Sequence, residues 1–191
     1  MKHLCLLQIG NSGIQPLQEL GAAMGKVFRV PFLVLPQALD PEVAFHAERQ
    51  QYHSSEILAA MQAFNTNESW RMLGVTAVDL YIPILTFVFG EAQIGGPCAV
   101  VSSHRLRQEF YGLPADAELL RERLLKEAVH EIGHTLELSH CHEYRCAMAA
   151  SHAVEWIDIK DAWLCPQCQA RALGALEEAP SAAGFRPSAH T

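Results

Sequence analysis

Short apolar runs separated by turn residues occupy much of the first hundred positions of this chain. Runs of this kind, rich in β-branched and aromatic side chains, predict β-strands. We expect five strands, at 4–9, 27–35, 74–82, 85–92 and 98–103. Their ends are marked by turn formers, namely Pro36, Pro83 and the run Gly95-Gly96-Pro97. The pattern therefore predicts one central sheet.

Between these runs the apolar residues recur at helical spacing. A helix is predicted at 14–24, ending at Gly25, and a second from Ser54 or Ser55, either a suitable N-cap, to about Phe64. The polar segment 40–53 is predicted to be a loop with some helix. Strands that alternate with helices indicate an α/β fold with a twisted, mixed and largely parallel sheet.

A longer helix is predicted after Pro114, where Asp116 can cap its first turn. Apolar residues follow at helical spacing through Leu120, Leu124 and Ala128 and form a face that packs on the sheet. The histidines beyond them lie off this face, where the helix can border a cleft. A final helix is expected at 167–178, followed by a mobile tail at 179–191 that is rich in Ala, Pro and Ser.

Composition narrows the class of protein. Half of the 191 residues are hydrophobic and the net charge is −7, which suits one compact domain and excludes a basic nucleic-acid surface. The first ten residues lack the features of a signal peptide, and the sequence contains no apolar run of about 18 residues that would span a membrane. Six cysteines, four of them at metal-like spacings, favour a reducing compartment. We expect a cytoplasmic monomer without nucleic-acid or membrane partners.

The run His130-Glu131-Ile132-Gly133-His134 carries the candidate chemistry. Residues four apart on a helix share one face, about 6 Å apart along the axis. His130 and His134 can therefore bind one metal ion, and Glu131 can reach a water on that ion without being a ligand. Two histidines on a solvated helix face are the alternative.

His140 cannot join this site from a continuing helix, where it would lie about 9 Å further along the axis. The helix must end near 136–138 and the chain must turn back. Three histidines with one open position would then form a catalytic zinc site. The alternative is that His140 interacts with the C-terminal dipole of the helix.

Four cysteines follow at spacings that suit a second metal. Cys141, Cys146, Cys165 and Cys168 can form a closed tetrahedral zinc site, which would be structural because no position stays open. Two alternatives use the same residues differently. His142 can replace Cys141 as a ligand, and Cys165-Pro166-Gln167-Cys168 can act as a redox pair. Cys5 and Cys98 are expected to be small buried hydrophobic residues.

These residues resemble the signature of the metzincin zinc peptidases, and more narrowly of the archaemetzincins. The matching motif is His-Glu-x-x-His-x-x-Gly-x-x-His, then Cys-x4-Cys-x-Met, then Cys-x-x-Cys, and Asp79–Pro83 and Phe87–Ala92 are also similar. The resemblance implies a zincin-like fold, with subdomains 1–139 and 140–178, and two Zn²⁺ per chain. It implies a catalytic zinc on His130, His134 and His140, a structural zinc on the four cysteines, and Met148 packed beneath the histidines. It also implies that strand 85–92 is the antiparallel edge strand that lines the cleft.

The chain departs from the motif at one position, where Glu137 replaces the family glycine. Glycine accepts positive φ freely, whereas glutamate held there costs on the order of 1–2 kcal/mol. Three outcomes are open. The turn is built differently, Glu137 is strained, or its carboxylate hydrogen-bonds a ligand histidine.

The expected function is hydrolysis of peptide bonds by zinc-activated water, with Glu131 as general base. A non-catalytic zinc-binding scaffold that recognises peptides and a metal-buffering role for the cysteines are the rivals. An aminopeptidase-like mode would need an acidic group for the substrate amine, for which Glu91 and Glu137 are candidates. Tyr144 is a weak candidate as an oxyanion donor. His104, His152 and Trp163 are expected to be packing or surface residues.

Overall fold

A computed structural model of the chain describes residues 2–11 and 14–177. The expected tail, 179–191, lies outside the described residues. The central sheet has five strands in the order β2-β1-β5-β8-β7. They are β1 (His3–Ile9), β2 (Phe32–Leu39), β5 (Ser69–Thr76), β7 (Gly90–Ala92) and β8 (Cys98–Ser102). All neighbouring pairs are parallel except β7 with β8, so the expected mixed, largely parallel sheet is confirmed.

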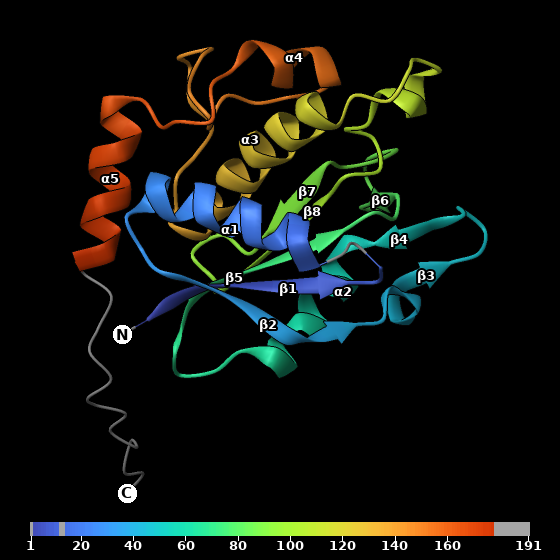
Figure 1. The fold of residues 1–191 in the computed structure, drawn as a ribbon, viewed down its shortest axis with the longest axis horizontal. Coiled ribbons are helices and arrows are strands. Elements are labelled where there is room, and N and C mark those ends of the chain that lie inside the picture. Colours follow the sequence, from blue (N-terminus) through green and yellow to red (C-terminus); the bar gives the residue numbers. More distant parts are fainter. Residues whose placement is uncertain (1, 12–13, 178–191) are drawn as a thin grey trace, which may run out of the picture.

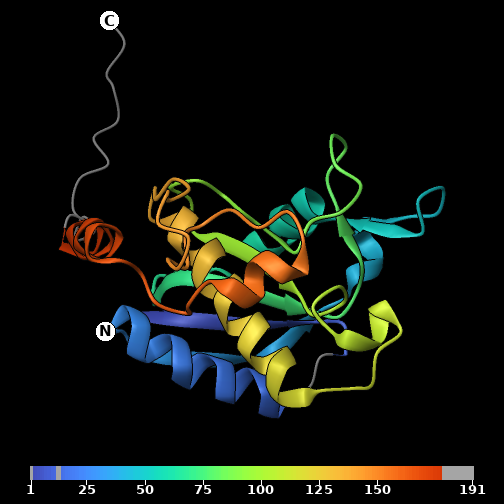
Figure 2. The same cartoon turned by 90° about the horizontal axis from the view of Figure 1, so that it is seen from above.

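Helices cover both faces of this sheet, as Figures 1 and 2 show. Helix α1 (Ile14–Phe28) and the long helix α3 (Ala117–Thr135) lie side by side on one face, and α2 (Ser54–Met61) lies on the other. Each face has its own apolar core. The β1 side chains alternate between the two cores, with Leu4 and Leu6 on the α1–α3 side and Cys5 and Leu7 on the α2 side.

A smaller sheet stands beside the main one. It contains β3 (Phe45–His46), β4 (Gln51–His53) and β6 (Leu80–Tyr81), after a short 3₁₀ helix at Pro41–Ala44. Strands β3 and β4 form a hairpin that projects from the body of the molecule, at the right in Figure 1. The segment 40–53 is thus partly strand, where sequence predicted a loop with some helix.

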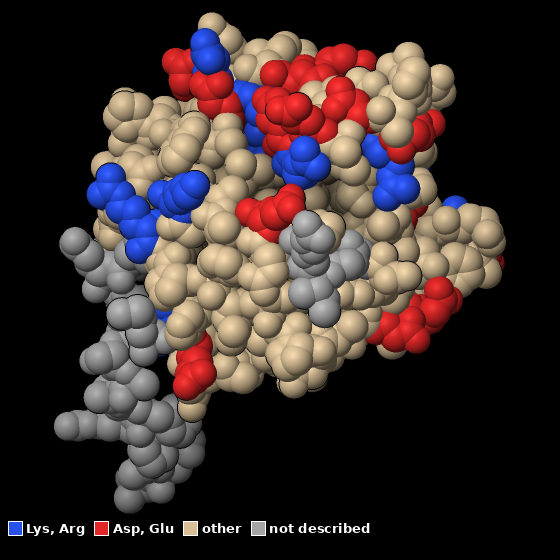
Figure 3. All heavy atoms as spheres, viewed as in Figure 1, with Lys and Arg blue, Asp and Glu red and all other residues tan. Residues whose placement is uncertain are grey.

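The remaining elements follow α3. A 3₁₀ helix at Gln108–Tyr111 precedes it, and α4 (Val154–Ile159) and α5 (Pro166–Glu177) come after it. The chain between Leu136 and α4 has no regular secondary structure. No helix in the described part of the chain is long and apolar enough to span a membrane. On the face drawn in Figure 3, acidic side chains gather toward α3 and α4, with lysine and arginine between them.

Several predicted boundaries were wrong, each for a physical reason. Helix α1 continues through Gly25 to Phe28 and ends where Arg29 adopts a left-handed conformation, so the next strand begins later, at Phe32. That strand also passes through Pro36. An edge strand tolerates proline because one of its sides forms no hydrogen bonds to a neighbouring strand, so the missing N–H is not needed there.

Two further predictions failed near the cleft. The predicted strand 85–92 is a strand only over its last three residues, and turns and a single bridge to Leu80 replace the rest. The predicted serine cap of α2 is absent because Ser54 donates to the Tyr81 carbonyl and Ser55 to Glu91. These serines tie α2 to neighbouring strands instead.

Candidate metal centre and cleft

Helix α3 carries the first two histidines. Asp116 caps it as predicted, since its carboxylate accepts a hydrogen bond from the Leu119 amide at 2.9 Å. The apolar face of the helix packs on β8, which fixes its rotation, and the last full turn presents His130 and His134 together. Both come from one rigid element, so their spacing depends little on loops.

A left-handed residue ends the helix and turns the chain toward the metal ligands. Glu137 has φ of +60°, and its amide and that of Leu138 bond back to the carbonyls of His134 and Gly133. This is a Schellman motif with glutamate at the position that usually holds glycine. Of the three outcomes open for Glu137, the structure shows the strained residue. The chain then reverses and brings His140 to the other two histidines.

The imidazoles of His130, His134 and His140 converge. Their nearest ring nitrogens lie within 4.8 Å of one another, and the ring centroids are 4.6–5.3 Å apart. Nδ1 of His130 lies 2.9 Å from the Ala147 carbonyl oxygen, and Nδ1 of His134 lies 2.8 Å from that of Leu138. A carbonyl oxygen only accepts, so each Nδ1 carries the proton and each Nε2 presents a lone pair.

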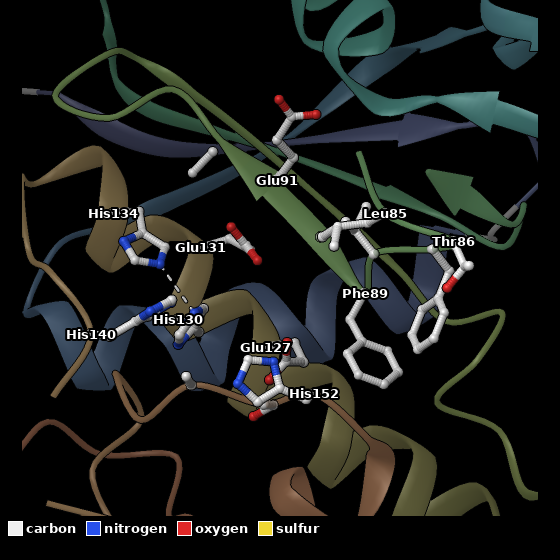
Figure 4. A pocket seen from close by; sticks show the side chains of 16 residues that line it. Leu85, Thr86, Phe89, Glu91, Glu127, His130, Glu131, His134, His140 and His152 are labelled. Atoms are coloured by element: carbon white, nitrogen blue, oxygen red, sulfur yellow. Dashed lines mark hydrogen bonds between the residues drawn. The ribbon is translucent and has the colours of Figure 1, made fainter. Parts of the chain in front are cut away.

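The two Nε2 atoms of His130 and His134 are 3.1 Å apart, the contact that Figure 4 marks with a dashed line. Two lone pairs at this distance repel unless a cation lies between them. Tetrahedral zinc with Zn–N bonds of about 2.05 Å places its ligand nitrogens about 3.3 Å apart. The three histidines therefore fit one zinc ion, and the backbone carbonyls supply the orienting partners that metal-bound histidines require.

Burial keeps these imidazoles neutral. It lowers the pKa of His130 well below its ordinary value and lowers the pKa of His134 and His140 as well. A neutral imidazole is the form that binds metal. His140 is the most exposed of the three, so one side of the cluster stays open to solvent.

Two glycines permit close approaches around Glu131. A Cβ at Gly90 would lie 2.7 Å from Glu131 Cγ, so only glycine lets strand β7 lie against this side chain. A Cβ at Gly133 would collide with the sulfur of Met148, which is fully buried beneath the helix.

Glu131 is 6% exposed, and burial raises its carboxyl pKa well above the usual range. A carboxylate with a raised pKa is a stronger base, which favours its acceptance of a proton from water.

The histidines and Glu131 border a cleft of about 490 Å³. One wall is the segment 85–92, which includes β7, and the other is formed by His140 and residues 150–152. In Figure 4, Glu131 lies between His134 and this segment, whereas the Glu91 carboxylate points away from the histidines. Glu91 instead accepts hydrogen bonds from the Ser55 hydroxyl at 2.8 and 3.1 Å.

The four predicted cysteines form a second cluster. The sulfurs of Cys141, Cys146, Cys165 and Cys168 lie within 4.8 Å of one another. The sulfurs of Cys141 and Cys165 are 3.8 Å apart, the separation of about 3.8 Å that Zn–S bonds of 2.3 Å impose on a tetrahedron. Backbone amides of Glu143 and Cys165 donate to two of these sulfurs. The cluster therefore fits zinc. Cys5 and Cys98 are buried as expected.

Other candidates from the sequence lie elsewhere. Tyr144 is 63% exposed and does not line the cleft, and His142 is exposed and outside the cysteine cluster. The Glu137 side chain lies against Gly95, and the third outcome for it fails because main-chain carbonyls, not its carboxylate, hold His130 and His134. Trp163 is 56% exposed, as expected of a surface residue.

Sequence reasoning missed two residues that line the cleft and a buried lysine that pairs with one of them. His152, expected to be a packing or surface residue, is exposed, and it also lines the wall beside His140. Glu127, one turn before Glu131, also lines the cleft and pairs with the fully buried Lys160, whose Nζ is 2.7 Å from its carboxylate. Glu127 was detectable by its helical spacing, but nothing local marks Lys160, which is 33 positions away.

Comparisons with known proteins agree with this geometry. The model of peptidase family M54 matches residues 27–173. The archaemetzincin of Methanocaldococcus jannaschii is 40% identical over 166 residues, which cover 87% of this chain and 90% of that protein. Another relative, the archaemetzincin of Archaeoglobus fulgidus, is 39% identical over 165 residues, covering 83% of this chain and 96% of that protein.

Solved structures share the fold as well. A crystal structure of the Archaeoglobus fulgidus archaemetzincin complexed with malonate has a TM-score of 0.75 and 38% identity, covering 90% of this chain and 99% of that one. A zinc-dependent peptidase from Methanocorpusculum labreanum has a TM-score of 0.80 and 28% identity, covering 88% and 99%. The resemblance inferred from the histidine and cysteine motifs is confirmed. The chain belongs to peptidase family M54, the archaemetzincins, and is a metallopeptidase.

Proposed function

We propose that this metallopeptidase hydrolyses peptide bonds with one zinc ion held by His130, His134 and His140 and with Glu131 as general base. The observation that carries the proposal is the pair of unprotonated Nε2 atoms, 3.1 Å apart, on two histidines whose Nδ1 protons are held by carbonyl oxygens. This arrangement is costly without a cation. Glu131 borders the same cleft, and its own carboxylate is not among the convergent ligand atoms.

Zinc and Glu131 have different roles in the proposed reaction. Zinc, when bound, lowers the pKa of a water toward about 7 and polarises a carbonyl. Glu131 accepts the proton of the attacking water and passes it to the nitrogen of the leaving amine. Burial of Glu131 excludes bulk water from this carboxylate, and the Gly90 main chain lies close enough to guide the substrate past it.

The edge strand β7 is the proposed binding surface for the substrate. It pairs with β8 on one side only, so its other edge offers main-chain groups to the cleft. An extended peptide can add to such an edge by backbone hydrogen bonds, which bind any sequence. Side-chain preference would then come from the walls at 85–89 and 150–152.

A second zinc on the four cysteines is proposed to be structural. It would join the irregular segment after His140 to the start of α5, where Cys165 immediately precedes the helix and Cys168 lies in its first turn. The segment has little regular structure of its own, and a metal held in the folded state adds its binding free energy to folding.

Replacement of Glu131 with glutamine tests the catalytic assignment. The variant should keep the wild-type zinc content and thermal stability and lose turnover of a mixed peptide library by at least about 100-fold. His140→Ala is the matched control and should lose both the catalytic zinc and turnover. Full activity of Glu131→Gln would overturn the role of Glu131. Zinc binding without cleavage of any peptide by wild-type enzyme would favour the scaffold alternative.

Glu91 distinguishes two modes of cleavage. An aminopeptidase-like activity needs an anion for the substrate ammonium, and Glu91 is the cleft carboxylate that is held by a neutral hydroxyl, Ser55. Paired peptides with free and acetylated N-termini provide the test. A preference for the free amine that Glu91→Gln abolishes assigns the aminopeptidase mode. Equal cleavage of both peptides assigns cleavage within chains.

A further inference from the structure

A third group of metal-ligating side chains lies outside both zinc clusters. His46 ends β3, His53 ends β4, and Glu56 lies in the first turn of α2. The nearest ligand atoms of the three residues lie within 4.8 Å of one another, the limit that also contains the catalytic histidines. The peptidase mechanism and the structural zinc use none of these residues.

The distances resemble those between ligands of one ion. Glu56 Oε1 lies 3.4 Å from His46 Nε2 and 3.2 Å from His53 Nδ1. Ligands of tetrahedral zinc with bonds of about 2.05 Å are about 3.3 Å apart, so two edges of the expected polyhedron are present. The two imidazoles also face each other edge to face, with centroids 5.7 Å apart.

The contact between His53 and Glu56 has the distance of an ion pair but poor hydrogen-bond alignment. Nδ1 of His53 is shielded from solvent and close to the Glu56 carboxylate, yet it is not aligned as a donor or acceptor with any partner. A ring nitrogen that is shielded from water and poorly aligned with its neighbour forgoes part of its hydrogen-bond energy. Convergence of its lone pair on a shared cation removes that cost.

The surroundings hold the imidazoles in place and leave room for exchange. The ring of Tyr81 stacks on His53 at 5.3 Å and meets His46 edge to face at 5.6 Å. The side chains of His46 and Glu56 are 43% and 46% exposed, so water can complete the coordination. Arg49, in the hairpin, donates hydrogen bonds to main-chain carbonyls of the cleft wall rather than to Glu56.

We propose that His46, His53 and Glu56 bind a third divalent first-row metal ion, with two imidazoles and one carboxylate as ligands and water in the remaining positions. Imidazole and carboxylate together suit zinc and nickel better than calcium or magnesium. The ion would join the projecting hairpin β3–β4 to helix α2.

The position of this site gives it a consequence for the cleft. The hairpin holds the cleft wall through Arg49, which donates to the carbonyls of Leu85 and Thr86 at 3.1 and 3.2 Å. Gln51 also donates to the Thr86 carbonyl, at 3.0 Å. The hairpin belongs to a small sheet in which only β4 pairs with β6, over two residue pairs, so few backbone contacts anchor it. A metal that joins the hairpin to α2 therefore braces the wall at 85–86.

Zinc stoichiometry tests the proposal. Full-length wild type and a His46→Ala, Glu56→Gln variant are equilibrated with a small excess of free zinc and measured by native mass spectrometry. The variant should bind one zinc fewer than wild type, whatever the occupancy of the other two clusters. Glu48→Gln, which changes an exposed carboxylate in the turn of the same hairpin, is the control and should bind as many ions as wild type. Equal zinc content in wild type and double variant would overturn the site.

A second set of measurements tests the proposal even if the double variant does not fold. The single substitution His46→Ala removes a half-exposed ring from the surface and should lose the same zinc equivalent. Crystals of wild type grown with zinc should show an anomalous peak between His46, His53 and Glu56 at the zinc absorption edge. Peaks at the histidine and cysteine clusters without a third peak would show that the cluster is a set of ordinary surface contacts.

Discussion

Replacement of Lys160 with methionine should destabilise the protein far more than loss of an ordinary lysine. The Lys160 side chain is fully buried, and its Nζ lies 2.7 Å from the carboxylate of Glu127, which is itself 4% exposed. Nζ also donates to the Ala149 carbonyl at 3.3 Å, beside the segment that supports His130. Removing the lysine leaves a buried carboxylate without a counterion.

The expected cost is about 3–5 kcal/mol, the range for breaking a buried ion pair on one side. A domain of this kind has a free energy of unfolding of about 5–15 kcal/mol, so the loss is a large share. Urea unfolding followed by tryptophan fluorescence, with zinc present throughout, measures it. With a slope of about 2 kcal/mol/M, the midpoint should fall by about 1.5–2.5 M.

A double-mutant cycle identifies the cause. Combining Lys160→Met with Glu127→Leu replaces both charges with apolar groups and should recover most of the lost stability, because no charge is then buried alone. Arg145→Met is the control, since Arg145 and Asp161 form a similar ion pair whose side chains are 60% and 44% exposed. Its midpoint should hardly change. A cost below about 1 kcal/mol for Lys160→Met, or additive effects in the double variant, would refute this reasoning.

Three further predictions concern the end of α3 and the cysteine cluster. Gly133→Ala should cost about 1–3 kcal/mol in urea unfolding, because its Cβ collides with the Met148 sulfur; Gly174→Ala, whose Cβ meets open space, should not destabilise. Glu137→Gly should raise the free energy of unfolding by about 1 kcal/mol, because glycine relieves the positive φ; unchanged stability would show that the glutamate is unstrained. Cys168→Ser should remove one zinc and speed hydrogen exchange in α5, and exchange equal to wild type would argue against a structural zinc.

The local chemistry of this protein was largely predictable. Helical spacing of His130 and His134 requires a shared face in any fold, and the cap at Asp116 depends only on its own turn. The end of the helix before His140 followed from simple geometry. Strand boundaries were less predictable, because pairing decides them. The run 85–92 is apolar enough for a strand, yet only Gly90–Ala92 finds a partner in β8.

Other features depend on packing between distant segments. The buried ion pair of Glu127 and Lys160 joins residues 33 positions apart, and no local sequence pattern predicts it. The cluster of His46, His53 and Glu56 likewise depends on a hairpin that sequence predicted as a loop. In both cases a polar side chain acquires its role only from the neighbour that the fold supplies.

By itself, the sequence identified the candidate metal ligands, because ligand identity and short-range spacing along a helix or turn are local properties. It also determined the α/β class through the alternation of strand and helix patterns. Only the tertiary structure decided which edge strand borders the cleft, which carbonyls orient the histidines, and which buried charges are paired. Those features depend on contacts between segments far apart in the chain, where burial and not spacing sets the free energy.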